Sequence, residues 1–493
     1  MENEEKVTIK LHKELLESER KELKEKRKRK FLIFLLCLLM FVTGGVCGFA
    51  LTGVFKGTSV ALFKKDKLDK IVSYFDSMWL YKNDYEDLKQ TMEDKAFYGM
   101  TKFSEDAYSS YMSKEEIASF ADGINMNYVG IGAQYSYTGG VGTVTRVFKD
   151  SPAEKGGMLA GDILYKVDGI SLDGLDSDQI KEKIVGEEGT IVKVTVLRSG
   201  KEIELTMSRG PIEYTAYASN KDDYVLLDLM SFGETTADEC IKYLDEYKDY
   251  SKLIIDLRDN TGGYQNSVQE VAGLFIGENK VVLKETDNTG TTKEYETICK
   301  KYYDNFKKII VLTNSNTASA AEVLSICLKE QHSNTLLVGE TTYGKGVVQT
   351  SFYLEDGSAL KITSSYWSSP NGVSINSEGV KPDAEVKLDP VLYETAVSMI
   401  EDEKYEFDSV SNFVKVAEEG LKFLDYNVDR TDGYFDESFK NALFQYKADN
   451  DLVKDYVLDY DTYNAIISSV IREYNENPLK DYQMVKAIEL LKD

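Results

Sequence analysis

Two residues that could act together as a nucleophile and its base, Ser319 and Lys345, lie 26 residues apart in the chain. A serine nucleophile needs a group that accepts its proton, and that group is most often a histidine. The chain has only two histidines. His12 precedes a long apolar segment, and His332 is expected at the far end of a helix that starts near Ser319, roughly 20 Å away at about 1.5 Å per residue. A buried, neutral lysine can replace histidine as the base, so the sequence predicts a Ser319 and Lys345 pair.

The residues around Ser319 predict a strand followed by a helix. Lys308–Thr313 is a β-branched run typical of a buried strand, and residues 318–329 show helical spacing. The turn between them would place Ser319 at a helix start, where the N–H of Ala320 could stabilise an oxyanion. Ser319 and Glu322 also match a capping box, in which the serine would only cap the helix, and this alternative stays open.

A second predicted strand, Lys252–Leu257, runs into a turn that contains Gly262 and Gly263. Paired glycines after a strand let backbone N–H groups approach a ligand closely. One of these two glycines could therefore supply another oxyanion contact. An ordinary turn of asparagine and glycine is the alternative explanation of the same pattern.

Lys345 stands directly before a predicted strand over residues 347–354. Gln349 lies four residues after it, an even spacing that puts both side chains on one face. Four residues of straight strand span about 13 Å, so a direct contact would need a bend, for which Gly346 is suited. To act as a base, the lysine needs a pKa well below about 10.4, which desolvation or a nearby cation can achieve. A solvated surface lysine is the alternative.

Five ordered motifs make the chain resemble the carboxy-terminal processing peptidases, or tail-specific proteases. The motifs, which lie within residues 65–390, are Leu257–Gly263, Asn316–Glu322, Gly339–Gln349, Gly357–Thr363 and Gly379–Asp383. The resemblance implies a crotonase-like core in which Ser319 is the nucleophile and Lys345 the base. It also implies that Gln349 orients the lysine and that Gly262 and Ala320 form the oxyanion hole.

The segment before this core resembles a PDZ domain, which we expect over residues 121–210. The matching residues are Asn127–Ala133, Ser151–Met158, Gly161–Leu164 and Val167–Gly169. In PDZ domains the N–H groups of a glycine-rich loop hold the terminal carboxylate of a peptide, while the peptide adds a strand to the sheet edge. The resemblance gives this role to Gly130, Ile131 and Gly132, with a bare glycine turn as the alternative.

An apolar segment without charged residues, Phe31–Phe55, follows a basic run at Lys24–Lys30. As a helix the segment would measure about 37 Å, which is enough to span a bilayer. The basic run predicts a cytoplasmic N-terminus. We therefore expect a single-pass membrane anchor with the rest of the chain outside, and a cleaved signal peptide is the alternative.

The composition restricts the partners and cofactors of the chain. Its 493 residues carry a formal net charge of −25, and the acidic excess lies after the basic N-terminal segment. This charge argues against nucleic acid as a partner. Five cysteines give no disulfide framework, and no cluster of cysteine and histidine predicts a metal site. The predicted chemistry needs no cofactor.

Residues 411–466 resemble a peptidoglycan-binding module of three helices. The supporting residues are Leu421, Leu424, Tyr426, Asp432, Gly433, Tyr434, Phe435, Phe439, Ala442, Phe444, Gln445 and Thr462. The second Asp-Gly turn of such a module is replaced by Lys454–Tyr456. Binding to the cell wall is one interpretation of this segment, and a helical interaction module is the other.

Together these features predict a multidomain α+β protein. The expected parts are a basic cytoplasmic tail (1–30), a membrane helix (31–55), a helical segment (56–120), a PDZ β-sandwich or barrel (121–210), an α/β peptidase core (211–398) and a C-terminal helical domain (404–493). The predicted function is an extracytoplasmic serine endopeptidase that binds protein C-terminal tails and cleaves through an acyl-enzyme. The alternatives are a catalytically silent PDZ scaffold and an enoyl-CoA-type enzyme, and homo-oligomerisation stays open.

Overall fold

The computed structural model describes residues 65–138, 140–198, 201–212, 214–395, 399 and 402–492. The predicted cytoplasmic tail and membrane anchor lie outside these residues. None of the helices in the described ranges combines the length and the apolar character that a membrane crossing requires. The chain divides into two compact units, residues 1–96 and 97–493.

The described part of the first unit is helical, as predicted for the segment 56–120. It contains α2 (Lys65–Met78), the 3-10 helix η1 (Lys82–Asp84) and the start of α3 (Leu88–Met100). The ring of Trp79 contacts three other aromatic rings of this unit. These contacts stabilise the turn that follows α2.

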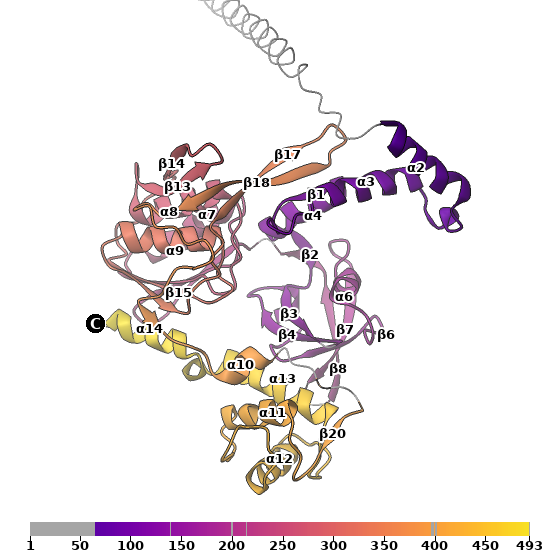
Figure 1. Cartoon of the computed structure of the whole chain (residues 1–493). Coiled ribbons are helices and arrows are strands. Elements are labelled where there is room, and N and C mark those ends of the chain that lie inside the picture. Colours follow the sequence, from indigo (N-terminus) through magenta and orange to yellow (C-terminus); the bar gives the residue numbers. More distant parts are fainter. Residues whose placement is uncertain are drawn as a thin grey trace, which may run out of the picture. The chain divides into compact units, whose positions relative to one another are not determined.

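The centre of the second unit is a six-stranded sheet in the order β10–β11–β12–β15–β16–β19 (Figure 1). Its strands are β10 (Ala216–Asn220), β11 (Val225–Leu229), β12 (Lys252–Asp256), β15 (Lys308–Thr313), β16 (Thr335–Gly339) and β19 (Ala384–Glu385). β10 is antiparallel to β11, and the later neighbours are parallel. The centres of β12 and β15 are aliphatic and buried, as parallel strands covered on both faces require.

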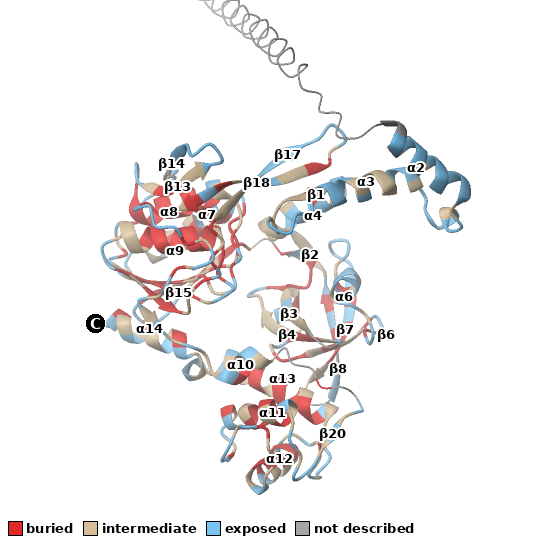
Figure 2. Cartoon of the chain, in the orientation of Figure 1, coloured by how far each residue is buried: buried red, intermediate tan, exposed pale blue. Residues whose placement is uncertain are grey.

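Helices cover both faces of this core sheet. One face carries α7 (Thr236–Leu244), the 3-10 helix η2 (Asp245–Tyr247), α8 (Gln265–Ile276) and α9 (Ala320–Gln331). Buried residues, red in Figure 2, concentrate in the sheet and in these helices. On the other face, Ala487 and Leu491 of α14 (Tyr482–Lys492) pack with Ile254 and Ile310. The predicted C-terminal domain therefore ends earlier than expected, because the apolar side of the last helix completes the core sheet.

A second sheet flanks the core and reaches into the segment around residue 110. Its strands are β1 (Ser110–Met112), β13 (Val281–Asp287), β14 (Thr292–Glu296), β17 (Val347–Tyr353) and β18 (Ala359–Ser368). β18 pairs with β1, β13 and β17. The strand predicted after Lys345 is thus β17, and β18 lies directly beside it.

The region predicted to be a PDZ domain forms a sheet in the order β3–β4–β5–β7–β8, with β6 paired to β5. These strands are β3 (Ala133–Thr138), β4 (Val141–Val147), β5 (Ile163–Val167), β6 (Ile170–Ser171), β7 (Ile191–Arg198) and β8 (Lys201–Ser208). The accompanying elements are α4 (Lys114–Asn125), β2 (Tyr128–Gly130), α5 (Pro152–Lys155), α6 (Ser177–Ile184) and β9 (Gly210–Ile212). The sheet, α5 and α6 bury a hydrophobic core of their own.

The C-terminal region contains the three helices that the sequence predicts, α11 (Asn412–Phe423), α12 (Glu437–Asp449) and α13 (Tyr460–Glu476). They pack around one buried cluster together with α10 (Pro390–Glu394). The short elements β20 (Lys404–Tyr405), β21 (Leu458–Asp459) and η3 (Pro478–Lys480) accompany them. Where the second Asp-Gly turn is missing, the buried Lys447 donates to Asp455 Oδ1 at 2.5 Å. Binding of this module to peptidoglycan stays a prediction.

Candidate active site

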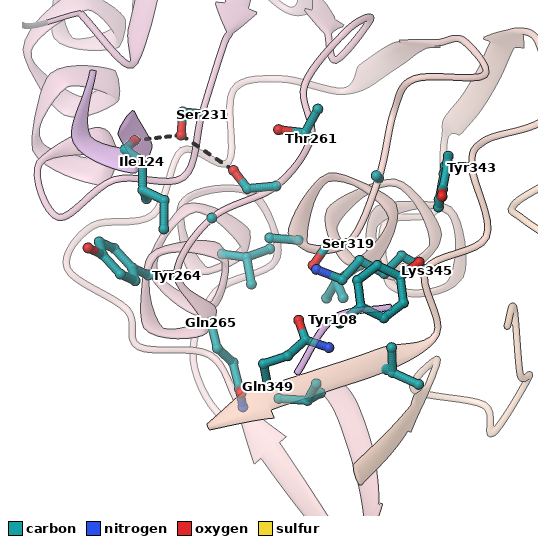
Figure 3. A pocket seen from close by; sticks show the side chains of 18 of the residues that line it. Tyr108, Ile124, Ser231, Thr261, Tyr264, Gln265, Ser319, Tyr343, Lys345 and Gln349 are labelled. Atoms are coloured by element: carbon teal, nitrogen blue, oxygen red, sulfur yellow. Dashed lines mark hydrogen bonds between the residues drawn. The ribbon is translucent and has the colours of Figure 1, made fainter. Parts of the chain in front are cut away.

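The loops that follow β12, β15 and β16 meet at the carboxyl edge of the core sheet, where parallel sheets commonly bind their ligands. These loops carry Gly262, Ser319 and Lys345. All three residues line one cavity of about 910 Å³, to which β17 contributes Gln349 (Figure 3). The fold therefore brings the predicted site residues of the core together.

Ser319 lies at the start of α9 in a strained backbone conformation, with φ 55° and ψ −119°. A positive φ is uncommon outside glycine and costs about 1–3 kcal/mol. An ordinary N-cap residue has an extended backbone instead. The N–H of Ser319 donates to Glu322 Oε2 at 2.8 Å, as in a capping box, but Ser319 also lines the cavity. Capping alone does not account for this turn.

The Glu322 carboxylate connects the turn of Ser319 to the loop of Lys345. It is fully buried and accepts four hydrogen bonds. The donors are the N–H of Ser319, the Thr342 hydroxyl at 2.5 Å, the N–H of Gly344 at 2.7 Å and the N–H of Lys345 at 2.9 Å. A buried carboxylate needs such donors to offset its lost hydration. Glu322 thereby fixes the positions of both predicted reacting residues.

Lys345 is partly buried, and its side chain points toward Ser319 in Figure 3. Burial lowers the pKa of Lys345, and the charge of Lys361 lowers it further, whereas Glu322 acts in the opposite direction. The Lys345 ammonium also lies 4.9 Å from the ring centroid of Tyr108. Lys345 is therefore a residue of the cavity and not a fully solvated surface lysine.

Gln349 lies at an irregularity of the second sheet. The register between β17 and β18 shifts between Val348 and Gln349. The Gln349 amide points into the cavity toward Lys345 in Figure 3, and its buried Nε2 has no hydrogen-bond partner among the described residues. An unsatisfied buried donor costs about 1–3 kcal/mol. A bend was expected at Gly346, whereas the irregularity lies between Val348 and Gln349. The orienting role of Gln349 stays a prediction.

The two residues of the predicted oxyanion hole lie next to Ser319. A Cβ atom placed on Gly262 would lie 2.8 Å from Ser319 Cβ and 3.0 Å from Ala320 N. Ala320 is the first residue of α9, so its N–H has no acceptor within the helix. The N–H of Gly262, in contrast, donates to Asn260 Oδ1 at 2.8 Å. To bind an oxyanion, this N–H would have to exchange that hydrogen bond.

Buried polar contacts hold the three loops together. Asn260 is fully buried, and its Nδ2 donates to the carbonyl of Leu229 at 2.7 Å. Its own carbonyl accepts the N–H of Ala318 at 2.9 Å. The carbonyl of Thr317 accepts the N–H of Tyr343 at 3.0 Å. The glycine turn, the serine turn and the lysine loop are therefore linked in series.

His332 lies at the opposite end of α9 from Ser319. Its Nδ1 is 2.9 Å from Thr335 Oγ1, and its Nε2 is 3.2 Å from the carbonyl of Phe306. Burial lowers the pKa of this imidazole. The ring is thus engaged in local contacts, in line with the expectation that it is not the base.

Two further residues of the cavity, Tyr108 and Lys361, were not among the predicted site residues. The segment of Tyr108 is held by Asp106, whose Oδ1 accepts from Thr363 Oγ1 at 3.0 Å. Burial raises the pKa of the Tyr108 hydroxyl. Lys361 lies within the motif Gly357–Thr363, which was the only sequence signal for it.

The predicted carboxylate loop of the PDZ region lines a second cavity of about 450 Å³, together with α6. Among the hydrogen bonds of the described residues, the N–H groups of Ile131 and Gly132 serve no acceptor, which leaves them available to a ligand. Gly130 belongs to β2 and lines the same cavity. Gln134 and Thr261 line both this cavity and the cavity of Ser319, so the two are neighbours.

The thiols of the described chain are free and are not activated. They belong to Cys240, Cys299 and Cys327. Burial raises the pKa of each of these thiols, whereas a nucleophilic cysteine needs a lowered pKa. The described residues also contain no group of three or more histidine, cysteine, aspartate or glutamate side chains placed to hold a metal ion.

Comparison with known proteins gives family matches to both central regions. Residues 223–386 match the model of peptidase family S41, and residues 143–198 match that of the PDZ domain. The chain is 33% identical over 476 residues to the carboxy-terminal processing protease CtpA of Bacillus subtilis, covering 94% of this chain and 99% of that protein. It is 30% identical over 451 residues to a probable CtpA-like serine protease of Staphylococcus haemolyticus, covering 90% of each. Among solved structures, the photosystem II D1 C-terminal processing protease matches with a TM-score of 0.42 and 24% identity, over 64% of this chain and 88% of that one.

Proposed function

Because the chain belongs to the carboxy-terminal processing serine proteases of peptidase family S41, we propose that Ser319 is its nucleophile and Lys345 its general base. The observation that carries this proposal is the Glu322 carboxylate, which binds the N–H groups of both residues. A base must lie within hydrogen-bonding reach of the proton that it accepts. Because the buried Glu322 carboxylate binds the backbones of both Ser319 and Lys345, it can hold their side chains within that distance.

In the first step, the neutral amine of Lys345 accepts the hydroxyl proton while Ser319 Oγ bonds to the carbonyl carbon of the scissile peptide. The negative charge that develops on the carbonyl oxygen is stabilised by the N–H of Ala320 and by the glycine turn at Gly262. The C–N bond then breaks, and the Lys345 ammonium gives its proton to the leaving amine. The products of this step are an acyl-enzyme on Ser319 and a peptide with a new amino terminus.

In the second step, water attacks the acyl-enzyme. Lys345 accepts a proton from the water, and the hydroxide equivalent bonds to the acyl carbon. When the ester bond breaks, Lys345 returns the proton to Ser319 Oγ, and the other product leaves with a new carboxylate. Desolvation serves both steps because it keeps the amine of Lys345 unprotonated closer to neutral pH.

We further propose that the PDZ domain binds the C-terminal carboxylate of the substrate through the N–H groups of Ile131 and Gly132. The available donors of this loop support the proposal, as does the common wall of Gln134 and Thr261 between the two cavities. A tail bound in the PDZ cavity would lie next to the cavity of Ser319. The substrate is then an unstructured protein end and not a folded surface.

Replacing Gly132 with alanine should impair cleavage of tailed proteins by about tenfold or more, because a Cβ there would lie 2.4 Å from Ser151 Cβ and deform the loop. Cleavage of short peptides that make no use of the PDZ domain should change little. Gly130→Ala is the matched control on the same loop, since its Cβ would meet Val185 Cγ1 at an ordinary 3.9 Å. Equal loss on tailed and short substrates would contradict the role of this loop.

We also propose that residues 31–55 anchor the protein in the cell membrane with its body outside, on the basis of the apolar segment and the basic run before it. Protease added to intact cells stripped of their wall should therefore degrade the chain beyond residue 55. One antibody against the chain beyond residue 55 and another against residues 1–30 would detect the outer and the cytoplasmic part separately. A body that resists digestion until the cells are lysed would disprove this topology.

A further inference from the structure

Lys361 is a second lysine in the cavity that contains Ser319 and Lys345. It lies on β18, opposite Ser351 of β17, and Ser351 is two residues beyond Gln349. Side chains two residues apart on a strand lie on one face, and directly paired residues share a face of the sheet. Lys361 therefore extends toward the cavity from the same face of the second sheet as Gln349.

One contact of Lys361 favours its charged form without cancelling the charge. Its Nζ lies 4.7 Å from the ring centroid of Phe120 on α4. An aromatic face attracts an ammonium group through its quadrupole. It adds no formal negative charge, so the positive potential of Lys361 still acts on the rest of the cavity.

We propose that Lys361 is a positioning residue whose positive charge keeps the amine of Lys345 unprotonated, so that Lys345 can accept the proton of Ser319. The inference rests on the proposed roles of Ser319 and Lys345. Two ammonium groups in one partly desolvated cavity repel each other, and the loss of one proton relieves the repulsion. A neighbouring cation is one of the established ways to activate a lysine.

The remaining titratable groups around the cavity do not reverse this effect. Burial and the charge of Lys361 both lower the pKa of Lys345, and the charge of Glu322 raises it. The Glu322 charge is already engaged by four hydrogen-bond donors. The other such groups that line the cavity are Tyr108, Tyr264, Tyr343 and Asp259. The Asp259 carboxylate is bound by the side-chain amides of Asn314 and Asn316.

Burial also lowers the pKa of Lys361. At Lys345, burial and the neighbouring charge of Lys361 act in the same direction. In the proposed reactive form at neutral pH, Lys345 is an amine and Lys361 is an ammonium group.

The test is the rate at which a serine-reactive fluorophosphonate labels Ser319 in the full chain across neutral and alkaline pH. In Lys361→Met, the pH of half-maximal labelling should rise by about one unit, so that labelling near neutral pH falls by about tenfold and recovers at high pH. Lys361→Arg should keep the profile of the parent because a guanidinium stays charged. Lys387→Met, at an exposed lysine, is the control and should change nothing.

An unshifted pH profile in Lys361→Met, or a loss that is the same at every pH, would overturn the inference, because either result would leave Lys361 with a structural role only. Thermal unfolding of each variant accompanies the labelling, and Lys361→Gln is measured in its place if Lys361→Met does not fold. Failure of the proposed function has a different signature, since Lys345→Ala would then be labelled at the rate of the parent.

Discussion

Lys345→Ala and Ser319→Ala are each expected to lose at least about 10³-fold in cleavage of an unstructured protein with an apolar C-terminus. A nucleophile and its base act as a unit, so either single change should cost about as much as both together. Lys345→Arg should be equally inactive, because a guanidinium does not release its proton near neutral pH. The measurement is kcat/KM for residues 56–493, with intact folding verified by thermal unfolding.

His332→Ala is the control for this prediction and should retain activity. Its ring contacts Thr335 and Phe306 at the far end of α9 and does not line the cavity of Ser319. A fully active Lys345→Ala variant would disprove the mechanism and return Ser319 to the role of a helix cap. Activity lost in His332→Ala without loss of stability would instead show that an imidazole takes part.

The activity of the parent should rise with pH as Lys345 loses its proton. The direction follows from its lowered pKa, because only the unprotonated amine can accept the serine proton. The rise therefore begins below the usual titration range of lysine. Loss of the Lys361 charge should shift this pH profile, whereas damage to the fold should lower the activity at every pH. The pH profile therefore distinguishes the two causes, and the rate at a single pH does not.

The local elements around the site could be predicted because their patterns are strong. The aliphatic run Lys308–Thr313 coincides with β15, since a parallel strand covered on both faces must be apolar throughout. The helix expected over residues 318–329 is α9, shifted by two residues at each end. The strand that leads to the loop of Lys345, β16, was not predicted, and it places Lys345 at the same sheet edge as Ser319.

The connections between these elements could not be predicted, because they depend on residues that are distant in the sequence. Glu322 matches a helix cap by its spacing, yet its carboxylate also binds the N–H groups of Gly344 and Lys345. Phe120 contributes its ring to the environment of Lys361 from a separate helix. The engagement of the Gly262 N–H by a side chain likewise requires the folded turn. Only the folded loops of the site show which of their polar groups are already hydrogen-bonded within the protein.

Gly262→Ala is expected to reduce acylation of Ser319 by about 10²–10³-fold, the effect of losing one oxyanion donor, because the added Cβ would displace the glycine turn and its N–H. The substitution acts twice at this position. An added Cβ would lie 2.8 Å from Ser319 Cβ and 3.0 Å from both Ala318 O and Ala320 N. It would also occupy a backbone with φ 107°, where an L-residue costs about 1–3 kcal/mol. Pre-steady-state acylation and fluorophosphonate labelling would both measure the loss.

The matched control is Gly290→Ala, because Gly290 has a similarly positive φ of 81° but no atom within 4 Å of an added Cβ. It lies in the turn between β13 and β14, away from the lining of the cavity. Backbone strain alone should lower its thermal stability and leave its activity intact. If Gly290→Ala lost as much activity as Gly262→Ala, general destabilisation would explain both variants. If Gly262→Ala were acylated like the parent, the glycine turn would have no part in the oxyanion hole, and Ala320 would remain its one assigned donor.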